Sequence, residues 1–173
     1  MRGVINERYK LRYDYTVCLT PYSEDWRRIR DCHCSWIHAV LHGIDYKALD
    51  IGSRLIRGLP SKNIVDLLLI VPKGMELTIV ETLSSHGLEA IPVPEVSTTP
   101  MLRLRDECGN PILHLHIDHT ADRPDVLFHS RLRQDSELVR AYGQMKKEAQ
   151  EKSGGDIMVY NQLKSEFFNN LSF

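Results

Sequence analysis

One carboxylate within an apolar run constrains this chain more than any other feature. The run from Ile64 to Val71 is hydrophobic except for Asp66, and Pro72 and Gly74 follow it. Such a run is typical of a buried strand. Because a charge removed from water must find a partner, a metal ion or a proton, the sequence predicts that Asp66 belongs to a polar site built on that strand.

The composition is that of an ordinary globular chain. It has 173 residues, of which 42% are hydrophobic and 26% are charged, so one domain with its own core is expected. The formal net charge is −1. A protein that coats nucleic acid carries a basic excess, so there is no strong nucleic-acid signal.

The cysteines and the hydrophobic runs indicate the cellular compartment of the protein. The four cysteines form no Cys-x-x-Cys pair and no pattern of a disulfide framework. No run reaches the roughly 18 apolar residues of a membrane span, and no N-terminal segment indicates secretion. We expect a reduced, cytoplasmic protein that does not enter membranes.

Hydrophobic periodicity predicts strands in the first two thirds of the chain and helices in the last third. Residues 13–19 are expected to form a first strand or the approach to it. Further strands are expected at residues 46–51, 64–71 and 88–93, with a hairpin of 101–105 and 111–118; helices are expected from Ser23 to Gly43, at 76–85, and from Pro124 onward. This order predicts an α/β fold of α+β character, with a mixed sheet and a C-terminal helical layer. Residues 1–16 are expected to be an N-terminal extension, and residues 17–173 one domain with its core in 17–120 and its helical part in 121–173.

A turn and nearby cations precede the predicted buried strand. Glycine at Gly52 lets the backbone approach a ligand closely, and free amides around Ser53 can hold phosphate oxygens. Arg54 and Lys62 add positive charge that suits a phosphate-bearing ligand. The alternative is an ordinary tight turn with solvated charges in the loop.

Three polar side chains alternate along the second hairpin strand. The period of two places His114, His116 and Asp118 on one face of that strand. Together they are candidates for metal binding or proton transfer, and a solvent-exposed polar face is the alternative.

Two tyrosine–lysine pairs recur in the helical part. Tyr142 and Lys146, like Tyr160 and Lys164, lie four residues apart and therefore share a helical face. Lysine stems lying over tyrosine rings would produce the same spacing.

Together these segments resemble the GrpB-like family of predicted nucleotidyltransferases, within the polymerase-β-like nucleotidyltransferase superfamily. The resemblance covers residues 17–171 and rests on five segments: Val17–Tyr22 with Trp26; Gly52-Ser53 followed after 12 residues by Asp66; Gly58-Leu59-Pro60 with Lys62; Leu113–His116; and Leu127–Phe168. It implies a mixed-sheet nucleotidyltransferase-like core. It also implies a nucleotide site that includes Gly52, Ser53, Arg54, Lys62, Arg133, Tyr142, Lys146, Tyr160 and Lys164.

The resemblance also implies a divalent metal, Mg²⁺ or Mn²⁺, because the superfamily uses acids on one strand face to hold it. Asp66 matches the first acid, but Leu68 stands in the place of the second. Asp118 is a candidate for the third acid, so Asp66 and Asp118 are the catalytic candidates. With His114 and His116 they are the expected metal ligands, and imidazole would favour Mn²⁺ over Mg²⁺. Asp50 and Arg54 depart from the family's His-Ile-Gly-Ser-Thr.

Three functional hypotheses follow. The first is a metal-dependent nucleotidyltransferase that acts from a nucleoside triphosphate on an unknown acceptor. The second is a non-catalytic module that binds a nucleotide or another phosphate-bearing small molecule. The third is a purely structural or partner-binding domain.

Overall fold

A five-stranded mixed sheet organises the computed structural model, which describes residues 15–91 and 99–169. Its spatial order is β1 (Lys47–Asp50), β2 (Val65–Ile70), β5 (Pro111–Asp118), β4 (Met101–Arg105) and β3 (Glu89–Ile91). The central pair β2–β5 is parallel, and every other neighbouring pair is antiparallel. The mixed sheet with helices confirms the expected fold class.

One face of the sheet carries the main core. Strand β2 directs Val65, Leu67 and Leu69 to this face, and β5 directs Leu113, Leu115 and Ile117 to it. Helices α2 (Asp25–Val40) and α3 (Glu76–Ser85) cover it with Ile37, Ile79 and Leu83 among others. Because side chains alternate along a strand, Asp66 and the polar residues of β5 must point to the opposite face.

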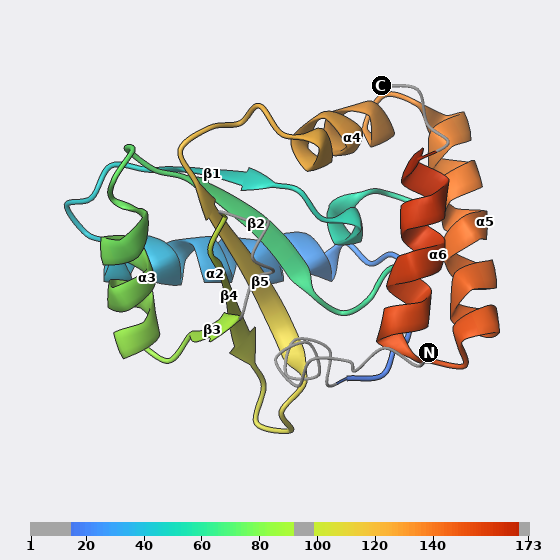
Figure 1. The fold of residues 1–173 in the computed structure, drawn as a ribbon, viewed down its shortest axis with the longest axis horizontal. Coiled ribbons are helices and arrows are strands. Elements are labelled where there is room, and N and C mark those ends of the chain that lie inside the picture. The colour runs from blue at the N-terminus through green and yellow to red at the C-terminus, as the bar shows by residue number, and fades with distance from the viewer. Residues whose placement is uncertain (1–14, 92–98, 170–173) are drawn as a thin grey trace, which may run out of the picture.

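Three C-terminal helices flank that opposite face. They are α4 (Pro124–Leu132), α5 (Ser136–Ser153) and α6 (Ile157–Asn169). Figure 1 shows α5 and α6 packed side by side beyond one end of the strands, with α4 near the end of β1. A second hydrophobic cluster, which includes Leu59, Phe128 and Tyr142, joins this helical layer to the loop before β2. The sheet and the helices therefore enclose space above the polar face.

The predicted elements agree with the structure except near the N-terminus. The bounds expected for helix 76–85 and for both hairpin strands match α3, β4 and β5. Residues 13–19 are expected to be a strand or the approach to one, and the strand prediction is wrong for 15–19, which form no strand pairing. An isolated bridge joins the next residue, Thr20, to Ser61. Val17 instead donates its amide to the Gly155 carbonyl, so this segment runs along the helical layer and not along the sheet. Residues 13–14 and 92–93 of predicted strands, and most of the predicted extension, lie outside the described residues.

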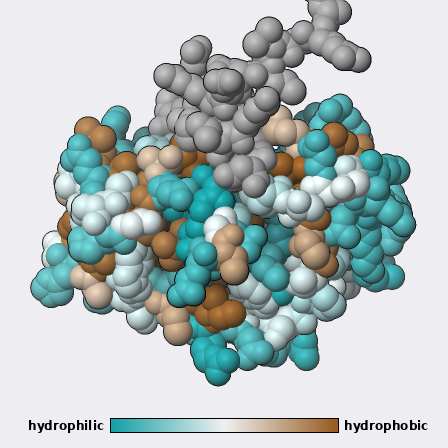
Figure 2. Space-filling view, turned by 90° about the horizontal axis from the view of Figure 1, so that it is seen from below, coloured by the Kyte–Doolittle hydropathy of each residue, from teal (hydrophilic) through white to brown (hydrophobic). Residues whose placement is uncertain are grey.

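The helices and one face of the surface can be compared with what a membrane span or a large apolar surface requires. None of the helices in the described ranges has the length and apolar character needed to cross a membrane. On the face drawn in Figure 2, hydrophobic side chains are interspersed with hydrophilic ones and do not form one continuous apolar surface.

Candidate functional site

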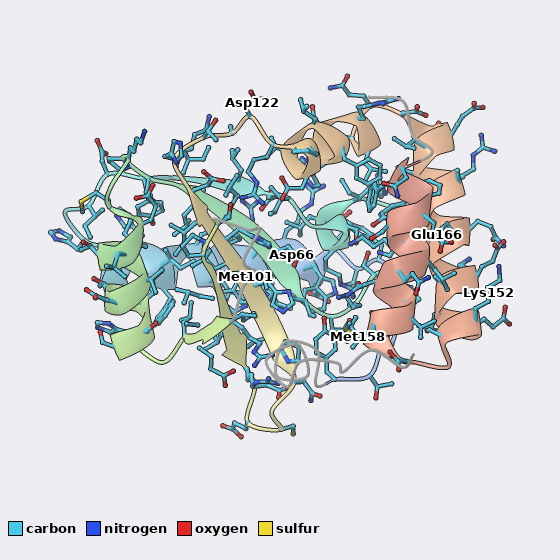
Figure 3. All side chains as sticks on the ribbon, in the orientation of Figure 1. Asp66, Met101, Asp122, Lys152, Met158 and Glu166 are labelled. Carbon is cyan, nitrogen blue, oxygen red and sulfur yellow. The ribbon has the colours of Figure 1, made fainter. Side chains whose placement is uncertain are left out.

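A cavity of about 410 Å³ lies between the polar face of the sheet and the helical layer. Its lining includes Gly52, Ser53, Lys62, Asp66, His114, His116, Tyr142, Lys146, Tyr160 and Lys164, all of which the sequence predicts as site residues. Figure 3 labels Asp66 on β2 and Met101 on β4, the strands on either side of β5, and both residues line the cavity. The Gly52–Ser53 turn, the acid of β2 and the histidine face of β5 thus converge although they are far apart in the sequence.

The Gly52–Ser53 turn packs directly against Asp66. The Ile51 amide donates to the Asp66 carbonyl at 3.1 Å. A Cβ atom placed on Gly52 would lie 2.6 Å from Asp66 Oδ2, which is closer than atoms can approach without displacement. Gly52 has an ordinary φ of −92°, so this close approach, and not backbone freedom, requires glycine.

Strand register pairs Asp66 with His114. The two residues are partners across the parallel β2–β5 pair, and His114 Nδ1 lies 3.2 Å from Asp66 Oδ1. Burial would raise the pKa of the Asp66 carboxyl, but the His114 hydrogen bond and the nearby charges of His114, Lys62 and His116 hold it well below its ordinary value. Asp66 is therefore a carboxylate at neutral pH. Burial lowers the pKa of His116 to about 4, so its imidazole is neutral there.

Lysines form the opposite wall of the cavity. Lys146 of α5 is only 2% exposed, and its Nζ donates to Ser53 Oγ at 2.7 Å and to Ser61 Oγ at 2.9 Å. Lys62 Nζ donates to the Tyr15 hydroxyl at 2.9 Å. Burial lowers the pKa of Lys62 to about 8 and holds that of Lys146 well below its ordinary value. Neither Lys62 nor Lys146 has a carboxylate within ion-pair distance among the described residues.

Three predicted site residues lie elsewhere. Arg54 is buried outside the cavity lining, where it donates to the carbonyls of Thr20 and Ser61 at 3.1 Å and lies over the Trp26 ring. Arg133 is bound to Asp50 at 3.3 Å, and is not a lining residue. The loop turns Arg54 inward, so its charge does not face the cavity.

Asp118 is the third of these residues. It shares the strand face of Asp66 but is the register partner of Ile70. At about 3.3 Å per residue, this places it roughly 13 Å along the strand from Asp66. Its carboxylate is engaged by Arg123 at 3.0 Å and by Thr99 at 3.2 Å. Asp66 and Asp118 therefore cannot share one metal ion in this arrangement.

The side chains present do not fit a metal site built by the protein. In the described ranges, no group of three or more His, Cys, Asp or Glu side chains is arranged to hold an ion. Asp66 is engaged with His114, and the place of a second acid is taken by Leu68, which is fully buried. The described residues around Asp66 would supply too few oxygens for the six-ligand shell of Mg²⁺.

Sequence reasoning missed several residues that shape the cavity. Tyr15, Met101, Pro124, Asp125, Phe128, Leu132, Asn161 and Phe168 also line it. Ser61 and His129 support it from behind: Ser61 bonds Ser53 Oγ at 2.9 Å, and the buried His129 ring hydrogen-bonds the Gly52 backbone. The sequence carries no local signal for these residues, since only the packing of α4–α6 brings them to the turn.

Comparison with known proteins decides the family. The family described as GrpB protein matches residues 16–172. The chain belongs to the GrpB family. The crystal structure of the conserved protein GrpB from Enterococcus faecalis is similar to this chain with a TM-score of 0.71 and 21% identity, covering 86% of this chain and 96% of that one. A search of curated proteins found no match.

The fold of this GrpB-family chain extends to nucleotidyltransferases. Cid1 poly(U) polymerase with Mg and 3′-dATP bound has a TM-score of 0.56 and 14% identity, covering 91% of this chain and 52% of Cid1. Cid1 with its short product ApU has a TM-score of 0.51 and 17% identity, covering 80% of this chain and 42% of Cid1. The chain thus spans about half the length of Cid1 and shares the fold of that part.

Proposed function

We propose that the cavity binds a nucleotide or another phosphate-bearing small molecule. The observation that carries this proposal is the convergence of Lys62, Lys146 and Lys164 on one cavity. Taking an ammonium group out of water is costly, and Lys62 and Lys146 have no carboxylate within ion-pair distance among the described residues. Phosphate oxygens would supply the missing negative charge and hydrogen-bond acceptors.

The serines beside Lys146 complete a phosphate-binding arrangement. Ser53 follows Gly52 at the turn, and its hydroxyl is held by Lys146 and by Ser61. A phosphate group beside Ser53 would meet both the hydroxyl and the amino groups of the cavity lysines. The carboxylate of Asp66 is turned to His114 at 3.2 Å, which limits its repulsion of such an anion.

The rest of the cavity suits an organic body attached to the phosphate. Its lining there is apolar and aromatic, with Met101, Pro124, Phe128, Leu132 and Phe168. A volume of about 410 Å³ lies in the range typical of small-molecule sites. Flat rings stack favourably on aromatic side chains, so a nucleobase is a natural occupant.

Nucleotidyl transfer is the second candidate function. Asp66 beside the Gly52–Ser53 turn favours it, as does the fold shared with Cid1. Transfer would need Mg²⁺ or Mn²⁺ to neutralise developing charge. Leu68 and the distant Asp118 leave Asp66 as the sole acid of β2 and β5 among the cavity-lining residues. Binding is therefore the function we put first.

A thermal-shift experiment tests binding. We expect pyrophosphate, ATP or UTP to raise the melting temperature, because a ligand that binds only the folded state stabilises it, by about 2.7 kcal/mol at 100 times its Kd. Lys164→Met should weaken this effect, whereas Lys152→Met, on the exposed side of α5, should leave it unchanged. Absence of any shift for all three ligands, with and without Mg²⁺ or Mn²⁺, would refute the proposal.

Release of pyrophosphate from ATP or UTP distinguishes transfer from binding. Transfer predicts release that depends on Mg²⁺ or Mn²⁺ and is abolished by Asp66→Asn. A chain that is stabilised by these ligands but releases no pyrophosphate is a binding module.

A further inference from the structure

Ser53, Ser61 and Lys146 form a closed triangle of hydrogen bonds. Lys146 Nζ lies 2.7 Å from Ser53 Oγ and 2.9 Å from Ser61 Oγ, and the two hydroxyl oxygens are 2.9 Å apart. These separations are those of strong hydrogen bonds. Ser53 and Ser61 lie eight residues apart in the segment before β2, and Lys146 comes from α5.

Lys146 has the surroundings of a base. Its side chain is almost fully buried, and no carboxylate of the described residues lies within ion-pair distance of its Nζ. Burial and the neighbouring cations Lys164, Lys62 and Arg54 lower its pKa, against the opposing effect of Asp66. The hydroxyls of Tyr142 and Tyr160, which line the same cavity, keep their protons, because burial raises the pKa of both. A neutral amine at this place can accept a proton from Ser53.

Only one of the two serines can meet a ligand. Ser53 lines the cavity, whereas Ser61 is 1% exposed and also bonds the Leu59 carbonyl at 3.5 Å. Ser61 therefore holds the other two groups in place. The cavity carboxylates are otherwise engaged, Asp66 with His114 and Asp125 with Arg123. Lys146 is the base that the geometry offers to Ser53.

We propose that Ser53 is a nucleophile toward phosphorus and that Lys146 is its general base. This goes beyond binding, and it rests on the proposed function only for its natural electrophile, a phosphoanhydride held by the cavity lysines. Ser53 Oγ forms a bond to phosphorus while its proton moves to Lys146 Nζ. The bond from phosphorus to the bridging oxygen breaks, and the leaving phosphate or pyrophosphate takes the electron pair. The product is a phosphoserine ester or a nucleotidyl-serine ester, and a later attack by water or an acceptor hydroxyl would release it.

This step would let the chain cleave a phosphoanhydride without the second acid on β2, whose place Leu68 takes. Activation of an attacking hydroxyl normally requires a base or a metal. With Leu68 in the place of that acid, the lysine base would activate a hydroxyl that belongs to the protein.

A fluorophosphonate probe tests the proposal, because the probe transfers its phosphorus to an activated serine oxygen and loses fluoride. We expect an adduct on Ser53, located by peptide mass spectrometry, whose rate of formation rises with pH as Lys146 loses its proton. Lys146→Arg keeps a cation with hydrogen-bond donors but removes the base, and should slow labelling by about 10²-fold or more. Ser165→Ala, on the exposed side of α6, should label like the wild type.

The wild type alone can decide the outcome if Lys146→Arg does not fold. No adduct on Ser53, or a labelling rate that does not change with pH at all, would overturn the proposal. Pyrophosphate stabilisation is measured on the same protein. Stabilisation without labelling refutes the nucleophile and leaves the binding proposal intact.

Discussion

The absence of a side chain at Gly52 allows the Gly52–Ser53 turn to pack against Asp66. Gly52→Ala would place a Cβ atom 2.6 Å from Asp66 Oδ2 and 2.7 Å from Asp66 Cβ. We expect a loss of about 1–3 kcal/mol in the free energy of unfolding, as for other overpacked sites, and weaker protection by pyrophosphate. Urea titration and thermal shift measure the two effects.

Gly143→Ala is the matched control for this change. Its added Cβ would contact Leu59 and Pro60 at 3.4 Å, and alanine is favoured over glycine within a helix such as α5. A stability no lower than that of the wild type is expected. If Gly52→Ala also behaves in this way, the contact with Asp66 does not constrain the turn.

The charge of Asp66 stabilises the folded state at neutral pH. Its pKa is lowered on folding, so the stabilisation is present above the unfolded pKa and is lost as the pH falls through the folded pKa. We predict that Asp66→Asn lowers the free energy of unfolding at pH 7 by about 1.5–3 kcal/mol, the value of a hydrogen bond to a charged group. The difference from wild type should shrink in strong acid. Urea unfolding at pH 7 and pH 3 measures the free energy of unfolding of the wild type, of Asp66→Asn and of the exposed control Asp45→Asn. An equal loss of stability in the two variants would contradict the prediction.

At the scale of elements, α5 matters most because it carries Lys146 into the cavity. Asp135 caps this helix, and its Oδ1 accepts the amides of Glu137 and Leu138, both at 2.9 Å. Asp135→Ala should lower the free energy of unfolding by about 1 kcal/mol, the usual cost of a lost N-cap. Chemical denaturation measures it. The exposed Asp122→Ala serves as control, and a stability equal to that control would show that the cap is dispensable.

Elements were predictable where the signals were local. The helix 76–85 and the hairpin of Met101–Arg105 and Pro111–Asp118 follow from periodicity and turn residues, and their bounds agree with the structure. The cluster of Ser61, Lys146 and Ser53 was not predictable as a unit. It depends on how α5 packs against the loop before β2, and no pattern within either segment encodes that packing. Arg54 illustrates the same limit, because the loop turns its side chain toward Trp26.

At the scale of the whole molecule, a buried histidine makes stability depend on pH. Burial, with the charge of Arg133, lowers the pKa of His129 to about 4, and its Nε2 has no hydrogen-bond partner in the described part of the chain. The folded pKa lies below the unfolded value near 6.5, so the unfolded state binds more protons between these values. The free energy of unfolding should therefore fall, by about 1–3 kcal/mol from this group, as the pH drops from 6.5 to 4.

His129→Gln tests this origin, because glutamine retains a donor for the Gly52 backbone but does not titrate in that range. The stability of the variant should decline less steeply with acid than that of the wild type. Part of the slope should remain, since the pKa of His116 is also lowered to about 4. His42→Gln, at an exposed position, should keep the full slope. An unchanged slope in His129→Gln would exclude His129 as its source.

The register that pairs Asp66 with His114 also bears on how the chain reaches its native state. These partners are 48 residues apart, and such non-local strand pairing is slow because much loop entropy is lost before contacts form. A slip of one residue would turn Asp66 into the apolar layer under α2 and α3 and expose Leu67 and Leu69 on the polar face. Misregistered intermediates are thus strongly disfavoured. The alternation of apolar and polar residues on β2 and β5 therefore favours the native register during folding. A chain that forms the β2–β5 pair in this register also brings Asp66 and His114 together on the cavity side of the sheet.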